Sequence, residues 1–101
     1  MLREPKPILD ADQIGIDALT FIASSEDLLN RFIDLTGYDA SQLRAQAEHP
    51  EFFVAVLDFI LANEPDIIDF ANHLALPPEA IGRARNILAK KAEIPMEDFP
   101  S

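Results

Sequence analysis

The chain of 101 residues contains no cysteine and no tryptophan, and it has only three glycines. Without cysteine it can form no disulfide, no thiolate zinc site and no iron–sulfur cluster. Basic residues are also few, with 8 Lys and Arg against 18 Asp and Glu, so the formal net charge is −10. Phosphate backbones and anionic membranes repel such a chain. The composition therefore disfavours nucleic-acid and membrane partners, and we expect a cytoplasmic protein.

Long apolar runs are absent as well. The longest extends from Phe52 to Ala62 and is interrupted by Asp58, whereas a membrane-spanning helix needs about 20 apolar residues. Hydrophobic residues still make up 49% of the chain, which is enough for a core and excludes a disordered acidic tail. We expect a single domain over residues 1–101, with an extended arm at 1–9 and an irregular tail at 93–101.

The spacing of apolar and capping residues predicts an all-α fold, because no strand-like alternation interrupts it. We expect six short helices. The first begins at Asp10 or Asp12 and the second at Ser24 or Ser25, and the others begin near Asp39, Glu51, Pro65 and Glu79. The fourth, over 51–63, is apolar on nearly every side, so the other helices should pack around it as an orthogonal bundle. In the fifth helix, the periodicity places both Ile67 and Ile68 among the buried residues.

A weak internal repeat appears at an offset of 38 residues. It aligns residues 32–47 with residues 70–85, so that Phe32 matches Phe70 and a turn residue, Gly37, matches Ala75. This alignment predicts two helix–turn–helix-like units on either side of the central helix.

Basic residues gather in the expected sixth helix. The window 80–92 holds four cations and no acid, so it carries +4 and leaves −14 for the rest of the chain. The four candidate contact residues are Arg83, Arg85, Lys90 and Lys91. Cations near the C-terminal end of a helix complement its dipole, and the same residues would also form a basic contact face.

The residues before this helix suggest one use for such a face. Ala71, Ala75 and Ile81 follow the spacing of a bacterial helix–turn–helix motif, which would place the cations on the recognition helix. Two prolines in the turn, the helix-weakening Gly82 and the −14 charge elsewhere count against this interpretation. The favoured interpretation of these residues is therefore a plain corner between two packed helices. A nucleic-acid-binding module is kept as the alternative function.

No pattern indicates catalysis or metal binding. The only histidines, His49 and His73, lack the paired spacing of a zinc site. No nucleophile elbow, phosphate-binding loop or EF-hand spacing is present. We therefore expect no enzyme, no catalytic or metal-binding residue and no cofactor.

Asp58 is a charge inside the otherwise apolar fourth helix, where a carboxylate needs a partner. We predict a buried ion pair between Asp58 and either Arg31 or Arg44, or else a polar groove that Asp58 lines.

Several short segments between Ile14 and Leu88 resemble an uncharacterised family of small alphaproteobacterial proteins, a domain of unknown function. The segments are Arg31–Phe32, Thr36–Gly37, Leu43–Arg44, His49–Pro50, Val56–Leu57–Asp58–Phe59, Glu64 and Pro78–Glu79. The family tends toward glycine where this chain has Ala75. The resemblance implies a small helical bacterial protein and supplies no activity, cofactor or site.

The sequence thus favours a non-catalytic protein–protein interaction or regulatory module with an unidentified protein partner. The excess of apolar surface also allows a homodimer. The nucleic-acid-binding module comes second, and a small-ligand site between the helices comes third.

Overall fold

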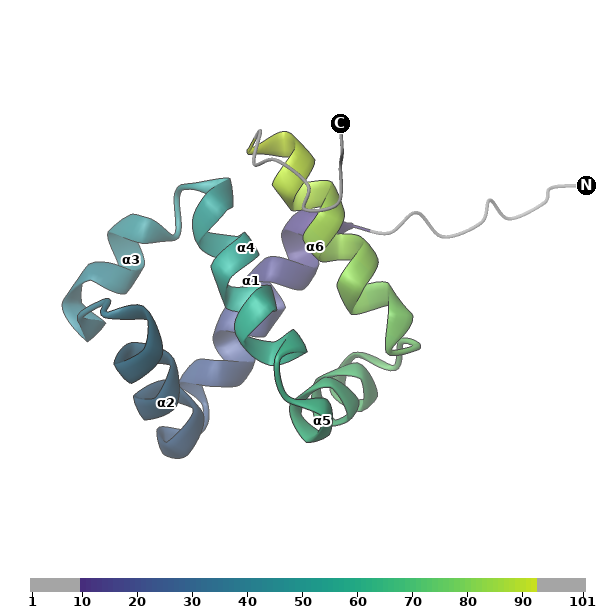
Figure 1. The fold of residues 1–101 in the computed structure, drawn as a ribbon, viewed down its shortest axis with the longest axis horizontal. Helices are drawn as coiled ribbons and strands as arrows, with labels where there is room; N and C mark the ends of the chain where they lie inside the picture. Colours follow the sequence, from purple (N-terminus) through teal and green to yellow (C-terminus); the bar gives the residue numbers. More distant parts are fainter. Residues whose placement is uncertain (1–9, 93–101) are drawn as a thin grey trace, which may run out of the picture.

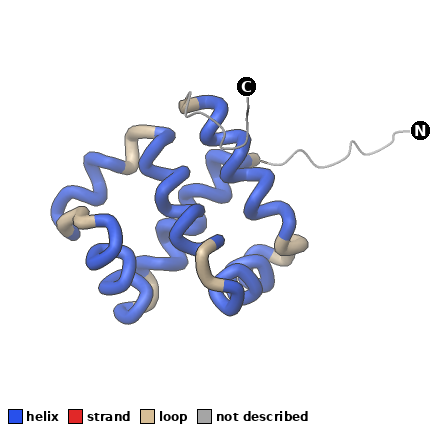
Figure 2. Tube along the Cα trace, viewed as in Figure 1, coloured by secondary structure: helices blue, strands red, loops and turns tan. Residues whose placement is uncertain are grey.

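The computed structural model describes residues 10–92, and Figure 1 shows them folded into helices joined by short turns. The helices are α1 (Ala11–Ala23), α2 (Glu26–Thr36), α3 (Leu43–Gln46), α4 (Pro50–Leu61), α5 (Glu64–Leu74) and α6 (Glu79–Lys91), with a 3₁₀ turn at Ala40–Gln42. This part of the chain contains no strand (Figure 2), so the all-α prediction is confirmed. The predicted arm at 1–9 and tail at 93–101 lie outside the described residues.

Short polar side chains begin three of the helices. The Asp10 carboxylate, the Ser25 hydroxyl and the Asn63 amide oxygen each accept a hydrogen bond from the backbone N–H three residues later, at 3.1, 3.3 and 3.4 Å. Such bonds satisfy N–H groups that have no carbonyl partner in the first turn of a helix. Of the two candidate caps that the sequence offers for each of the first two helices, Asp10 and Ser25 are the ones used.

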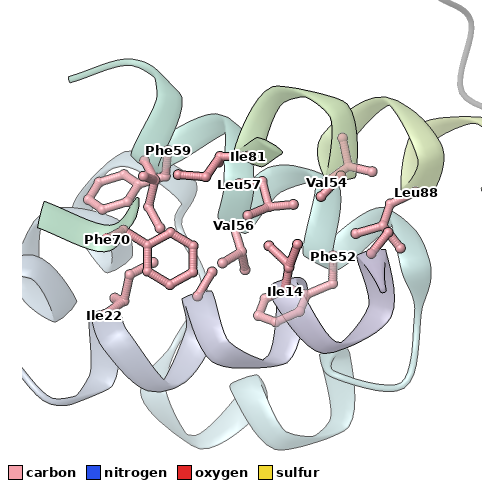
Figure 3. Close-up of a cluster of buried hydrophobic side chains, with 14 of the residues drawn as sticks. Ile14, Ile22, Phe52, Val54, Val56, Leu57, Phe59, Phe70, Ile81 and Leu88 are labelled. Carbon is pink, nitrogen blue, oxygen red and sulfur yellow. The ribbon is translucent and has the colours of Figure 1, made fainter. Parts of the chain in front are cut away.

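The core is built around α4, which packs against α1, α5 and α6. Its fully enclosed side chains include Val56, Leu57 and Ile60. Val56 and Leu57 lie in one buried cluster with Ile81 and Leu88 of α6 and Ile22 of α1 (Figure 3). Each large apolar side chain that is removed from water contributes roughly 1.5–3 kcal/mol. The predicted central apolar helix is therefore confirmed.

The repeat of 38 residues extends beyond the segments that the sequence aligns. Helix α2 spans residues 26–36 and α5 spans 64–74, so both have 11 residues and every boundary is shifted by 38. Helix α1 spans 11–23 and α4 spans 50–61, which agrees with the same shift to within one residue. Buried pairs at this offset are Ile14 with Phe52, Ala18 with Val56, Ile22 with Ile60 and Phe32 with Phe70. Two similar units, residues 10–46 and 49–91, thus form the fold.

The two units meet where α1 crosses α4, at the centre of Figure 1. Gly15 lies against Phe53 there, and a Cβ atom added to Gly15 would stand 3.1 Å from three atoms of that side chain. Gly15 and Phe53 are equivalent positions of the repeat. Contact between equivalent residues is the relation expected at a two-fold axis. The ring contacts between the halves are reciprocal as well, since Phe21 contacts Phe70 and the equivalent Phe59 contacts Phe32. The halves are therefore arranged with approximate two-fold symmetry.

Candidate functional site

The four cations of α6 do not form a uniform basic face. Arg85 donates from Nε to Oδ1 of Asp58 at 2.7 Å and from Nη2 to Oδ2 at 3.3 Å. Lys91 Nζ donates to the two carboxylate oxygens of Asp12 at 3.0 and 2.9 Å. Arg83 and Lys90 are exposed and make no ion pair with any residue between 10 and 92. Two of the four predicted contact residues are therefore already neutralised by aspartates.

The predicted partner of Asp58 is wrong. Asp58 on α4 pairs with Arg85 on α6, and the Asp58 side chain is 49% exposed, so this ion pair lies at the surface. The prediction failed because an apolar helix still has one face that its neighbours leave open. Arg44 is exposed and has no ion-pair partner among the described residues.

Arg31 instead pairs with Asp66, a residue that the sequence did not single out. Arg31 Nη2 donates to Oδ2 of Asp66 at 3.1 Å, and the guanidinium carbon lies 5.4 Å from the centre of the Phe59 ring. Asp66 is only 9% exposed. The pair joins α2 of one unit to α5 of the other, with Asp66 buried and the Arg31 side chain 45% exposed.

An apolar groove opens where the C-terminal end of α4, helix α5 and the first turns of α6 meet. Its volume is about 360 Å³. The residues that line this α4–α5–α6 groove are Leu61, Glu64, Ile67, Ile68, Pro78, Glu79 and Gly82. Ile68, which the periodicity placed in the core, is 46% exposed. The prediction for Ile68 was therefore wrong, because no helix within residues 10–92 covers that side of α5.

Two glutamates form the charged edge of this groove. Glu64 and Glu79 are both exposed, and neither makes an ion pair with another described residue. Arg83 lies one turn after Glu79 on α6, a spacing that often supports an ion pair, yet no ion pair joins the two. The groove therefore combines an apolar floor with a negative rim.

Gly82 lies in the interior of α6 and lines the same groove. A glycine inside a helix costs about 1 kcal/mol relative to alanine. Packing within the described residues does not require it, because a Cβ atom at this position would meet nothing within 4 Å. The missing side chain instead leaves the α6 backbone accessible from the groove. A glycine inside a helix, at a position where no turn requires it, is the sequence feature that could have pointed to this surface.

A second open hollow, of about 340 Å³, lies between the start of α1, the α3–α4 turn and the end of α6. Its lining includes the Asp12–Lys91 pair, His49 and Phe53. Both signs of charge are present on its rim, and it adjoins the last described residues of α6. Its chemistry is therefore less defined than that of the α4–α5–α6 groove.

The described residues contain no group of three or more His, Asp or Glu side chains that could hold a metal ion. Nor does any helix between residues 10 and 92 have the length and apolar character needed to cross a bilayer.

The family model for a protein of unknown function, DUF3572, matches residues 9–91. The chain belongs to this family. The match covers all the described helices, so both units of the repeat lie inside the DUF3572 domain. No curated protein and no solved structure matches the chain.

Proposed function

We propose that this DUF3572 protein is a non-catalytic module that binds another protein through the α4–α5–α6 groove. The observation that carries the proposal is the apolar floor of the groove, where Ile68 is exposed beside Ile67 and Leu61. Isolated apolar side chains on a surface are ordinary, but a concave apolar patch with a polar rim is typical of interaction sites. We place this binding in the cytoplasm, in keeping with the acidic, cysteine-free composition.

The dimensions of the groove favour a short segment as its ligand. Stable interfaces between folded proteins bury about 800 Å² per partner, which is far more than a groove of this size supplies. A helix or peptide that inserts a few side chains into a groove needs a smaller area and binds with moderate affinity. The proposed module therefore recognises a segment of its partner, in a reversible complex.

The nucleic-acid alternative has no observation in its favour. Arg85 and Lys91 are paired with aspartates, and the exposed Arg83 and Lys90 lie on a protein of net charge −10. Binding to a phosphate backbone depends on several unpaired cations on one face.

Photo-crosslinking from two equivalent positions tests the proposal. A photoreactive residue is placed at Ile68 in the groove and, as the matched control, at Asn30, the exposed position 38 residues earlier on α2. In cells of the source organism we expect a specific protein adduct from position 68 that position 30 does not form. The purified adduct partner should then bind wild-type protein and fail to bind Ile68→Asp. Identical adducts from the two positions, or none from position 68, would contradict the proposal.

A further inference from the structure

We propose that the ligand of the α4–α5–α6 groove is a cationic amphipathic helix of another protein. Its apolar side chains would lie against Ile68 and over Gly82, and its Lys or Arg side chains would face Glu64 and Glu79. This inference rests on the proposed function and adds the chemistry of the partner.

The charges around the groove favour a positively charged ligand. Glu64 and Glu79 belong to its lining, and no cation of residues 10–92 does. Neither glutamate has an ion-pair partner within the same range. A cationic segment gains attraction from both carboxylates and from the overall charge of −10, which also steers its approach. An acidic segment is repelled by the same charges.

Gly82 selects the shape of the ligand. Because it has no side chain and no described atom stands within 4 Å of its missing Cβ, a partner can approach the α6 backbone closely. Close approach over a small residue is the packing that lets one helix seat its side chains against another. The groove is lined by residues of α4, α5 and the start of α6, so a helix of the partner can insert a few apolar side chains between them.

A second copy of this chain fits the groove less well than a cationic partner does. Two copies each carry a net charge of −10 and therefore repel one another. Two of the α6 cations that could offset this repulsion already form ion pairs within the chain, Arg85 with Asp58 and Lys91 with Asp12.

Selection from a peptide library tests the inference even while the natural partner is unidentified. Random peptides of about 12 residues, roughly three helical turns, are selected on the full-length wild-type protein and counter-selected on Ile68→Asp. We expect enriched peptides that carry an excess of Lys and Arg and apolar residues three or four positions apart. Raising the salt concentration from about 0.05 M to about 0.5 M should weaken their binding at least tenfold, because it shortens the screening length.

The other outcomes separate failure of the inference from failure of the proposed function. Enriched peptides that lack a cationic excess, yet fail to bind Ile68→Asp, would overturn the inference and leave the proposed function standing. Absence of any peptide that prefers wild type to Ile68→Asp would overturn the inference and count against the groove as a binding surface. Asn30→Asp, which places the same charge on the equivalent position of α2, should bind every selected peptide as wild type does.

Gly82→Ala gives a second, independent measurement on the selected peptides. Alanine should raise the thermal unfolding midpoint, because it favours the helix, and should weaken peptide binding about tenfold, because its methyl group occupies the groove. Unchanged affinity would show that no ligand approaches α6 at this position and would overturn the proposed geometry.

Arg83→Glu tests the sign of the charge from the opposite direction. It replaces a positive charge by a negative one, one turn from Glu79, so binding of the cationic peptides should strengthen about threefold; weaker binding would contradict the inference.

Sedimentation of the wild-type protein over a concentration series completes the test. We expect a monomer, whereas a dimer that Ile68→Asp dissociates would assign the groove to a second copy and overturn the proposal.

Discussion

The two halves of this protein share a helical plan and differ in what they leave exposed. Residues 10–46 and 49–91 begin with matching helix pairs, α1 with α2 and α4 with α5, whose boundaries repeat at an offset of 38 to within one residue. The groove lies in the second half only. At the positions equivalent to Ile68 and Gly82, the first half has Asn30 and Arg44, which are polar and exposed. The two halves thus share several buried positions, such as Phe32 and Phe70, while their surfaces differ.

The halves also differ in the segment that follows their first two helices. In the first half it is a 3₁₀ turn followed by the four-residue α3, and none of its residues is buried. In the second half it is the 13-residue α6, whose Ile81, Ala84 and Leu88 belong to the core. Because α6 packs on both α4 and α1, the second half completes the core for both. This asymmetry means that the halves should depend on each other for stability.

Substitution of the equivalent phenylalanines, Phe32 and Phe70, should have the largest effect on stability and tests whether the two halves unfold together. Phe32 and Phe70 are both fully buried, so Phe32→Ala and Phe70→Ala should each lower the free energy of unfolding by about 3–5 kcal/mol. We expect one cooperative transition for each variant in urea denaturation followed by far-UV circular dichroism. Leu35→Ala is the control, because Leu35 is 75% exposed and should change stability by less than about 0.5 kcal/mol. A two-step transition in either variant would show that the halves unfold separately.

The same substitution at two glycines should have opposite effects. Gly15→Ala places a Cβ atom 3.1 Å from the Phe53 side chain at the crossing of α1 and α4. The crowding should outweigh the gain in helix propensity and destabilise the protein by about 1 kcal/mol. Gly82→Ala, where the Cβ has free space, should stabilise it by about 0.5–1 kcal/mol. Chemical denaturation compares the two, and a stabilised Gly15→Ala would mean that α1 and α4 do not pack closely at the axis.

The helix ends of the two halves provide a finer contrast. Gly37 ends α2 with φ of 78°, and Ala75 ends α5 with φ of 57°. A left-handed conformation is strained for alanine and free for glycine. Ala75→Gly should therefore raise the free energy of unfolding by about 1 kcal/mol, and Gly37→Ala should lower it by about the same amount. A destabilised Ala75→Gly variant would show that the backbone of Ala75 is not strained at that turn.

The ion pairs that join the halves should give the smallest effects, and these should differ. Asp66 is buried and Arg31 covers it, whereas both members of the Asp12–Lys91 pair are exposed. Double-mutant cycles should give a coupling energy of about 1 kcal/mol for Arg31–Asp66 and less than about 0.5 kcal/mol for Asp12–Lys91. Equal coupling energies would show that burial of Asp66 does not strengthen its pair.

Local sequence signals predicted most of the helices because their causes are local. Asp10 and Ser25 cap the helices that follow them, and Pro50 occupies the first position of α4, where a missing N–H is harmless. The apolar composition of residues 52–61 was enough to identify the central helix, since such a helix must be surrounded.

The candidate site was much less predictable. Periodicity assigns Ile68 to a helix face but does not show whether another helix covers that face. The partner of Asp58 was missed for a similar reason, because the distance between Asp58 and Arg85 depends on how α6 crosses α4. Gly82 was visible in the sequence as a weakness of the sixth helix, yet its relation to a groove required the position of α5.

The sequence by itself determined the all-α class, the central apolar helix and much of the helix capping, because hydrogen bonding and apolar periodicity act over a few residues. Tertiary structure alone decided the approximate two-fold arrangement, the choice of partner for Arg31 and Asp58, and the groove beside Ile68 and Gly82. These features depend on which helices lie side by side, and that arrangement follows from packing of the whole core rather than from any one segment.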